Sequence, residues 1–506
     1  MRKWVPLTAV LLGTAMLLID VTIVNVALPA VAGSLHTSFA SLQWVVDAYA
    51  LALAALLLGT GALADGIGHR RVYVVGLGLF AVASLVCGLA PNAGALIAAR
   101  AVQGIGGAAM FATTFPLINN AYAGRDRGIA YGLWGSVAGA SAAIGPVLGG
   151  LLVQGLSWRW VFFVNLPVSV LALVMCKRAV PADSGARRFA VDLPGTVTFT
   201  VAVAALTLGL IRTGDHGWGT ATYVLLALSA VSLAMFVAVE TRVSGPLMDL
   251  SLFRSPSFVG VMLAALLLNL TAFAVLTYTS IWLQSVIGLS PIQTGLTVLP
   301  LAVVSFVVAG VLGRYLHDVA PGPVIAAGLL LIGLGGLLSA ALLGEGSSWP
   351  ALVPGFVLTG AGVGLATPTL ASTAMSAVAP QQGGMAAGAV NTMRQLGFAL
   401  GIAILGTVVG SGAAASLRSG GGVPGGVDAT AHALVGGQAP VLLVRAGAAR
   451  GSLDHLLRVA EVHGLVRALL AVGVAGVAAA VAVSALVRKP VAAVTPAARG
   501  AVTVHG

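Results

Sequence analysis

Three ionisable residues, Asp20, Asp47 and Arg100, interrupt long apolar stretches of this chain. A charge that is removed from water is costly, so such a side chain usually faces a cavity or a partner. Burial favours the protonated form of a carboxyl group, whereas a nearby guanidinium favours the ionised form. We therefore predict that Asp20 carries protons, that Arg100 tunes it, and that Asp47 is a second titrating or substrate-facing acid. A purely structural role, through hydrogen bonds between helices, is the alternative for each.

The apolar stretches themselves define the class of protein. Of the 506 residues, 58% are apolar and 8% are charged, with 25 Lys and Arg against 14 Asp and Glu. A soluble domain carries about 25% charged residues, so an ordinary soluble enzyme, a disordered protein and a nucleic-acid binder are excluded. The net charge of +11 is spread over short connections rather than gathered on one basic face. The chain is predicted to be an all-α polytopic membrane protein.

Fourteen stretches are long and apolar enough to cross a bilayer, which takes about 20 residues. They are residues 7–31, 42–64, 72–91, 94–119, 129–153, 161–180, 193–212, 220–240, 257–283, 292–314, 323–343, 350–374, 384–410 and 464–486. We expect four parts: a six-helix N-terminal bundle over 1–190, two linking transmembrane helices over 191–256, a six-helix C-terminal bundle over 257–490, and a tail over 491–506.

Lysine and arginine gather in alternate connections, as the positive-inside rule requires. This distribution places the N-terminus and the 491–506 tail in the cytoplasm of a prokaryotic cell, with the chain in its inner (plasma) membrane. A long outer loop is expected at 411–463. Its first part is rich in glycine and the region around Val441–Val462 is amphipathic, so the loop either lies along the outer interface or is a disordered tether.

The connection between the second and third spans carries the most specific motif. Residues 61–71 read GALADGIGHRR. The glycines turn the chain, and Asp65 can cap a helix or pair with an arginine. The string resembles the loop signature of the major facilitator superfamily, although Gly66 stands where a basic residue is usual and His69 where arginine is common.

Other strings resemble the fourteen-span drug:proton antiporters of this superfamily. The string Leu96–Ala108 is similar to the intramembrane arginine motif, and Gly145-Pro146-x2-Gly149-Gly150 is similar to the helix-kinking motif of antiporters. Further matches lie at residues 19–29, 44–49, 157–167, 284–300 and 391–397. The resemblance runs from residue 7 to residue 410 and includes the last span.

The resemblance implies a major facilitator fold, with two six-helix bundles around a central cavity and two additional helices between them. It also implies proton-driven export of hydrophobic, often cationic compounds. Residues expected to act in gating or conformational change are Gly61, Asp65, Gly68, Arg70, Arg71, Gly145, Pro146, Gly149 and Gly150. Candidate substrate contacts are Asn25, Tyr49, Gln103, Trp282, Gln284, Asn391 and Gln395. The proton chemistry is expected in the N-terminal half, because the last six spans contain no Asp or Glu away from their ends.

The sequence shows no metal-ligand cluster, nucleophile triad or phosphate-binding loop, so we expect neither an enzyme nor a bound cofactor or metal. The expected partners are a small hydrophobic or cationic substrate, protons and the lipid bilayer, without nucleic acid, and we expect a monomer. A translocase for a lipid or lipid-linked precursor on the same fold is the alternative function.

Overall fold

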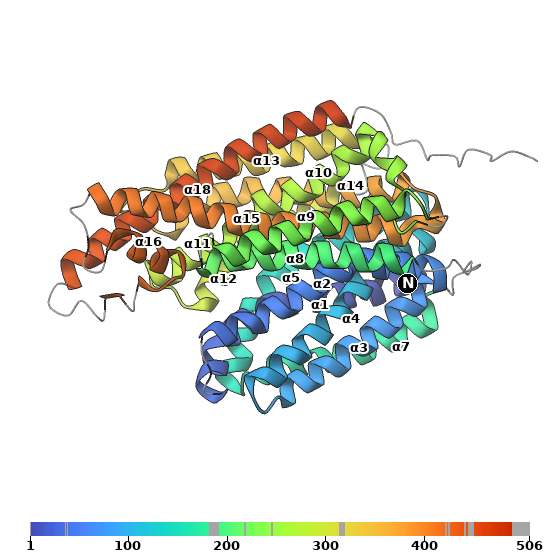
Figure 1. The fold of residues 1–506 in the computed structure, drawn as a ribbon, viewed down its shortest axis with the longest axis horizontal. Helices are drawn as coiled ribbons and strands as arrows, with labels where there is room; N and C mark the ends of the chain where they lie inside the picture. Colours follow the sequence, from blue (N-terminus) through green and yellow to red (C-terminus); the bar gives the residue numbers. More distant parts are fainter. Residues whose placement is uncertain are drawn as a thin grey trace, which may run out of the picture.

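The computed structural model consists of long helices that run roughly side by side (Figure 1). It describes residues 2–35, 37, 39–181, 192–216, 219–243, 246–312, 319–419, 423, 426–439, 442–443 and 450–487. Within these ranges every regular element is a helix.

The first half of the chain and the linking region form nine α-helices within the described ranges. They are α1 Val5–Leu35, α2 Phe39–Ile67, α3 His69–Leu89, α4 Ala93–Ala121, α5 Gly124–Gly155, α6 Trp160–Phe163, α7 Asn165–Ala179, α8 Leu193–His216 and α9 Thr220–Glu240, after the short helix η1 Arg2–Trp4. Asn92 begins α4 as an N-cap, because its side chain accepts a hydrogen bond of 2.9 Å from the amide of Ala95.

The second half repeats this all-helical pattern. Its elements are η2 Leu250–Arg254, α10 Pro256–Leu268, the π-helix η3 Asn269–Phe273, α11 Ala274–Ser285, α12 Pro291–Leu312, α13 Pro321–Leu342, η5 Trp349–Leu352, α14 Val353–Ser376, η6 Pro380–Gln382, α15 Gly383–Ser419, α16 Val427–Val435 and α18 Arg450–Leu486. Pro256 and Pro321 stand at first helical positions, where the missing amide hydrogen costs nothing.

Within the described residues, each of the fourteen predicted spans lies largely on helical residues. Thirteen helices in the described part of the chain are long and apolar enough to cross a membrane. The predicted span that is not among them, 129–153, lies in α5, which is 32 residues long. The prediction of an all-α polytopic membrane protein is confirmed.

The outer loop expected at 411–463 stays a prediction, and much of its described part is helical. Helix α15 continues to Ser419, α16 occupies Val427–Val435, and α18 already begins at Arg450. These helical ends pack together through a small apolar cluster that includes Leu417, Leu434 and Leu457. The apolar contact lets the ends of two long helices stabilise one another, which a local reading of glycine content does not reveal.

Helices α8 and α9, the two linking helices, pack against one another (Figure 1). Helix α8 also contacts α2 and α15, so the pair touches both halves of the chain. The predicted boundary at 190 and the tail at 491–506 lie outside the described residues, and the division into parts at 190, 256 and 490 stays a prediction.

Helices α3 and α4 cross where their backbones approach closely. A Cβ atom at Gly76 would lie 2.6 Å from the Cβ of Ala109 and 3.0 Å from the carbonyl oxygen of Gly106. Gly78, two residues along the same helix, has open space around it. Because lipid removes the hydrophobic drive between helices, close packing of small residues must hold them together. Of these two glycines on α3, Gly76 is the packing contact.

This difference gives a matched pair of substitutions. Gly76→Ala should destabilise the protein by about 1–3 kcal/mol, because the added methyl group overpacks the crossing. Gly78→Ala should be neutral or stabilising by up to about 1 kcal/mol, because alanine favours the helix and meets no neighbour. Thermal unfolding of the purified variants in detergent, followed by size-exclusion chromatography, measures both. Equal unfolding temperatures for the two variants would contradict the packing assignment.

Candidate functional site

Asp20 and Arg100 form a buried ion pair between α1 and α4. The guanidinium Nη1 lies 2.5 Å from Oδ2 of the carboxylate, and the two side chains are 0% and 1% exposed. Eighty residues separate them in the sequence. The two residues are therefore in contact, as predicted, and neither side chain is exposed to solvent.

Amide side chains complete the coordination of the carboxylate. Gln103 on α4 and Asn165 on α7 each donate to Oδ1 of Asp20, at 3.0 and 2.9 Å. Asn165 also donates to the hydroxyl of Ser84 on α3, at 3.0 Å. Four helices of the first half therefore meet at one network, and Asn165 is a member that the sequence analysis did not assign to the site.

Helix α2 holds the other side of Arg100. The carbonyl oxygen of Val45 accepts from Nε of Arg100 at 3.0 Å, and the guanidinium carbon lies 4.2 Å from the ring centroid of Tyr49. Gly104 on α4 makes this possible, because a Cβ there would lie 2.5 Å from the carbonyl oxygen of Tyr49. Tyr49, which we expected to contact substrate, instead stacks on the arginine in this conformation.

The hydrogen bonds of the network converge on the carboxylate of Asp20. Asp20 accepts bonds from three side chains that can only donate at those atoms, which suits a carboxylate rather than a carboxylic acid. Each charge of a buried pair compensates the other, so removing one partner leaves the other charge buried without compensation. The arrangement can change its charge only if the bond between Asp20 and Arg100 is loosened.

The remaining candidate near this network is Asp47, which is half-buried on α2. The side chains of Asn25 and Pro146, although both residues are helical, lie outside the described residues. Their predicted roles, in substrate binding and helix kinking, stay predictions.

A second site joins the two halves at the end of the molecule that holds the N-terminus, here called the N-terminal end (Figure 1). Asp65, near the end of α2, accepts hydrogen bonds from the backbone amides of Gly384 and Met385, at 2.7 and 2.8 Å. It thus caps α15 across 320 residues of sequence and places a negative charge at the positive end of that helix. His69 Nε2 lies 2.8 Å from the same carboxylate.

Close backbone contact supports the Asp65 cap. A Cβ atom at Gly61 would collide with the carbonyl oxygen of Gly384, and one at Gly388 would lie 2.8 Å from the carbonyl oxygen of Leu57. Further along α15, the buried amide of Asn391 donates to the carbonyl of Phe111 on α4, at 3.3 Å. The N-terminal end is therefore closed by α2, α4 and α15.

The other loop residues hold the turn itself. Gly68 has a φ of 107°, which only glycine adopts without strain, and it connects α2 to α3. Arg70 donates to the carbonyl of Lys177 at the end of α7, at 2.5 Å, whereas Arg71 is exposed.

Helix α5 lies against both halves through the predicted kink motif. A Cβ at Gly145 would collide with the hydroxyl of Thr22 on α1, and one at Gly149 would lie 2.9 Å from Ile23. Gly150 instead faces α12, where a Cβ would lie 2.6 Å from Ile292. The glycines of this motif are therefore helix-packing positions, and α5 remains helical from Gly124 to Gly155.

The candidates in the second half are not gathered at one place. Trp282 on α11 is fully buried in an apolar cluster with α18, Gln284 is exposed, and Gln395 is half-buried. The second half also contains Glu461 on α18, which is 3% exposed and accepts from Ser285 at 2.9 Å. Glu461 precedes the predicted span 464–486, which contains no acid, and it lies on α18 because that helix already begins at Arg450.

No group of three or more His, Cys, Asp or Glu side chains in the described part of the chain is placed to hold a metal ion.

Residues 10–402 match the sequence model of the Major Facilitator Superfamily. The chain belongs to this superfamily. It is a multi-pass membrane transporter of small molecules rather than an enzyme, and the resemblance found in its motifs is confirmed. Its fold agrees with solved members: human organic anion transporter MFSD10 superposes with a TM-score of 0.58 at 18% identity, covering 90% of this chain and 99% of that one. The proton:xylose symporter XylE superposes with a TM-score of 0.60 at 12% identity, covering 90% of this chain and 98% of that one.

Bacterial relatives of this superfamily member are resistance and export proteins. Multidrug resistance protein Stp of Mycobacterium tuberculosis is 37% identical over 411 residues, covering 80% of this chain and 76% of Stp. Puromycin resistance protein pur8 of Streptomyces alboniger is 37% identical over 441 residues, covering 85% of this chain and 87% of pur8. The tetracenomycin C resistance and export protein of Streptomyces glaucescens is 35% identical over 418 residues, covering 81% and 76%.

The ion pair predicts a specific double-mutant cycle. Asp20→Asn and Arg100→Gln should each destabilise the protein by about 3–5 kcal/mol, because each leaves one buried charge without its partner. The double variant should lose less stability than the two single variants lose together, since it leaves neither charge buried at this site. Thermal unfolding of the four purified proteins gives the coupling energy. Losses that simply add would show that the two charges do not depend on one another.

The Asp65 cap predicts a change in accessibility. In a protein with Cys87 and Cys176 replaced by serine, a cysteine placed at the fully buried Leu57 should react several-fold faster with a soluble maleimide when Asp65 is changed to Asn. The reason is that an asparagine turns its NH2 group toward one of the two backbone amides and loses a charged hydrogen bond worth about 1.5–3 kcal/mol.

Asp126→Asn is the matched control for this labelling experiment. Asp126 lies at the same end of the molecule, where its carboxylate pairs with Lys3 on the surface at 2.9 Å, and it should leave the labelling rate unchanged. The cap would have no role in closure if Asp65→Asn labelled no faster than this control.

Proposed function

We propose that this transporter exports hydrophobic drugs or antibiotics from the cell in exchange for protons. The names of its relatives support a drug or antibiotic as the transported compound, because Stp, pur8 and the tetracenomycin C protein are resistance or export proteins. The observation that carries the proton coupling is the fully buried Asp20–Arg100 pair, 2.5 Å apart.

Protonation of Asp20 weakens its bond to Arg100. A proton cancels the charge of the carboxylate and turns one of its oxygens into a donor, which no longer suits the guanidinium. Arg100 keeps two other partners, the carbonyl of Val45 and Oε1 of Gln103 at 2.7 Å. Uptake of a proton therefore loosens the charged contact between α1 and α4, where Gln103 still donates to Oδ1 of Asp20, while Arg100 keeps α4 attached to α2 through Val45.

This release connects the proton to the movement of helices. A compound bound between the two halves that favours the ionised pair expels the proton, and a proton on Asp20 disfavours that compound. Exchange of the compound for a proton across the membrane is antiport. It requires that the compound and the proton each bind a different arrangement of the same helices.

We assign the N-terminal end to the cytoplasm, because Lys3, Arg70 and Lys177 lie there and positive side chains are retained inside. In this orientation the structure is closed toward the cytoplasm by Asp65 and α15. The proposal further places the protein in the bacterial plasma membrane as a monomer, with both termini inside and with bundles 1–190 and 257–490 as its moving parts.

Proton exchange is tested in inverted membrane vesicles with an acidic interior and a fluorescent pH probe. Addition of ethidium, tetraphenylphosphonium, chloramphenicol or 9-anthracenecarboxylate should collapse the gradient for at least one of the four compounds. Asp20→Asn should abolish that response, since it cannot exchange a proton, and the surface variant Asp126→Asn should keep it.

The amount of folded protein is matched between vesicles, because Asp20→Asn also weakens the fold. The double variant Asp20→Asn, Arg100→Gln serves as a second inactive form without an unpaired charge. Drug-dependent proton movement that persists in both variants would refute Asp20 as the proton carrier. A response to lipid but to no drug would favour the translocase instead.

A further inference from the structure

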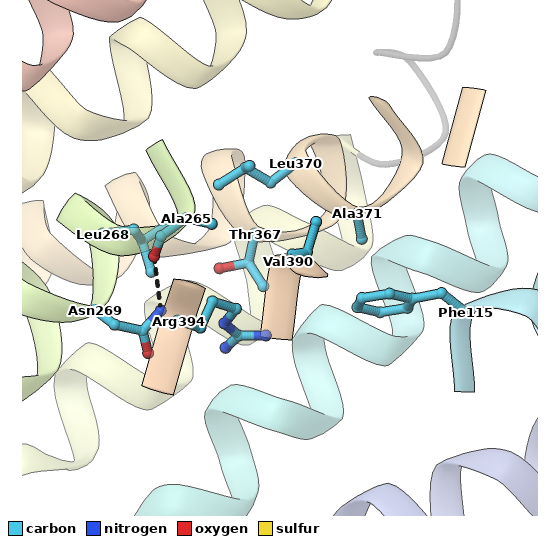
Figure 2. Close-up of a pocket in the computed structure, with 9 residues that line it drawn as sticks. All are labelled: Phe115, Ala265, Leu268, Asn269, Thr367, Leu370, Ala371, Val390 and Arg394. Carbon is cyan, nitrogen blue, oxygen red and sulfur yellow. Dashed lines mark hydrogen bonds between the residues drawn. The ribbon is translucent and has the colours of Figure 1, made fainter. Parts of the chain in front are cut away.

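Arg394 on α15 lies inside the molecule, at the interface between the two halves. Its guanidinium carbon is 5.7 Å from the ring centroid of Trp134 on α5, a side chain that is fully buried. It also lines a small cavity, which Figure 2 shows from within. The first half contributes Phe115 from α4, and the second half contributes side chains of α10, η3, α14 and α15, namely Ala265, Leu268, Asn269, Thr367, Leu370, Ala371, Val390 and Arg394.

This arginine has no acidic partner among the residues that the structure describes. Asp20 pairs with Arg100, Asp428 with Arg418, and Asp454 with Arg458, but no described carboxylate lies within 4.0 Å of Arg394. Its neighbour is an indole ring, which attracts a cation but does not neutralise it. A positive charge held between helices without an anion is costly, by several kcal/mol.

Two side chains near the guanidinium each have a buried hydrogen-bonding group with nothing to bind. The hydroxyl of Thr367 and the indole Nε1 of Trp134 are both buried without a partner. Asn269 lies across the cavity from Arg394 (Figure 2) at the first residue of the π-helix Asn269–Phe273. Such interruptions of an α-helix occur frequently at functional sites. Thr367 and Trp134 thus place two hydrogen-bonding groups without a partner near the charge of Arg394, whereas the amide of Asn269 already donates to the carbonyl oxygen of Ala265 at 3.2 Å.

We propose that this cavity binds the acidic group of the exported compound, such as a carboxylate, sulfonate or phenolate. The inference rests on the proposed export function and names the substrate class for it. The guanidinium binds a planar anionic group through two parallel N–H donors, which fits a carboxylate better than a neutral oxygen. The cavity measures about 10 Å³ in this conformation, which is room for about one water molecule, so the acidic end of the compound enters it when the halves part, with the apolar body between them.

Charge in the first half supports the same preference. The carboxylate of Asp20, which we expected to carry protons, is already paired with Arg100. A cationic compound gains little from a charge that has a partner, whereas an acidic compound gains a partner at Arg394. Because both halves line the cavity, binding there also favours one arrangement of the halves over others.

The test compares 9-anthracenecarboxylate with its methyl ester, which has the same aromatic body without the charge. Binding to the purified protein in nanodiscs is followed by quenching of tryptophan fluorescence, with empty nanodiscs subtracted. The wild type should bind the acid at least about tenfold more tightly than the ester, as a charged hydrogen bond gained in a buried site implies. Arg394→Gln should remove this preference and leave the affinity for the ester unchanged.

Matched variants keep the result interpretable. Arg418→Gln changes an exposed arginine at the end of the same helix and should keep the full preference. Thr367→Val removes the unpartnered hydroxyl and should weaken binding of the acid several-fold without weakening binding of the ester. If Arg394→Gln does not fold, the ratio of the affinities for the acid and the ester, measured in the wild type and in Thr367→Val, tests the proposal.

The proposal is overturned if the wild type binds acid and ester equally, if it binds neither, or if the preference survives Arg394→Gln. These outcomes are separate from a failure of the proposed function, because binding in nanodiscs requires no proton gradient. A protein that prefers the acid but moves no protons would retain the site and lose the antiport mechanism.

Discussion

The Asp20–Arg100 ion pair lies where water compensates neither charge, and the packing of the first half follows from that constraint. Both charges are satisfied only because α2, α4 and α7 bring Val45, Gln103 and Asn165 to them. A pair of this kind contributes little net stability, since desolvation offsets most of the attraction. Its value is that breaking it is expensive, so any event that changes the charge of Asp20 must also change how the helices meet.

Small residues let the two halves of the molecule contact one another closely. At Gly61 and Gly388 the backbones of α2 and α15 touch without intervening side chains, and Asp65 adds a charged cap to the same contact. Such an interface depends on close fit rather than on a hydrophobic drive, because lipid tails solvate apolar side chains as well as protein does. The two halves can therefore part along it without exposing a large apolar surface to an unfavourable solvent.

The two halves hold their charges in opposite ways. In the first half, acid and base lie together and cancel, with the side chain of Asp20 at 0% exposure. In the second half, Arg394 has an indole ring beside it and no carboxylate among the described residues. The first arrangement suits a proton that competes with an internal partner, and the second suits an anion from outside the protein. Under the two proposals, proton and cargo have separate sites that share the helices between them.

The sequence by itself determined the spans, the superfamily and the ionisable residues of the first half, because a bilayer demands about 20 apolar residues and makes each charge inside them conspicuous. Only the tertiary structure decided which side chains meet. Asn165 reaches Asp20 across 145 residues, and Asp65 caps a helix 320 residues away. Helix α15 continues to Ser419 and α18 begins at Arg450, where the ends of the two helices pack together. Such contacts depend on how distant helices pack in space, and that packing leaves no local pattern in the chain.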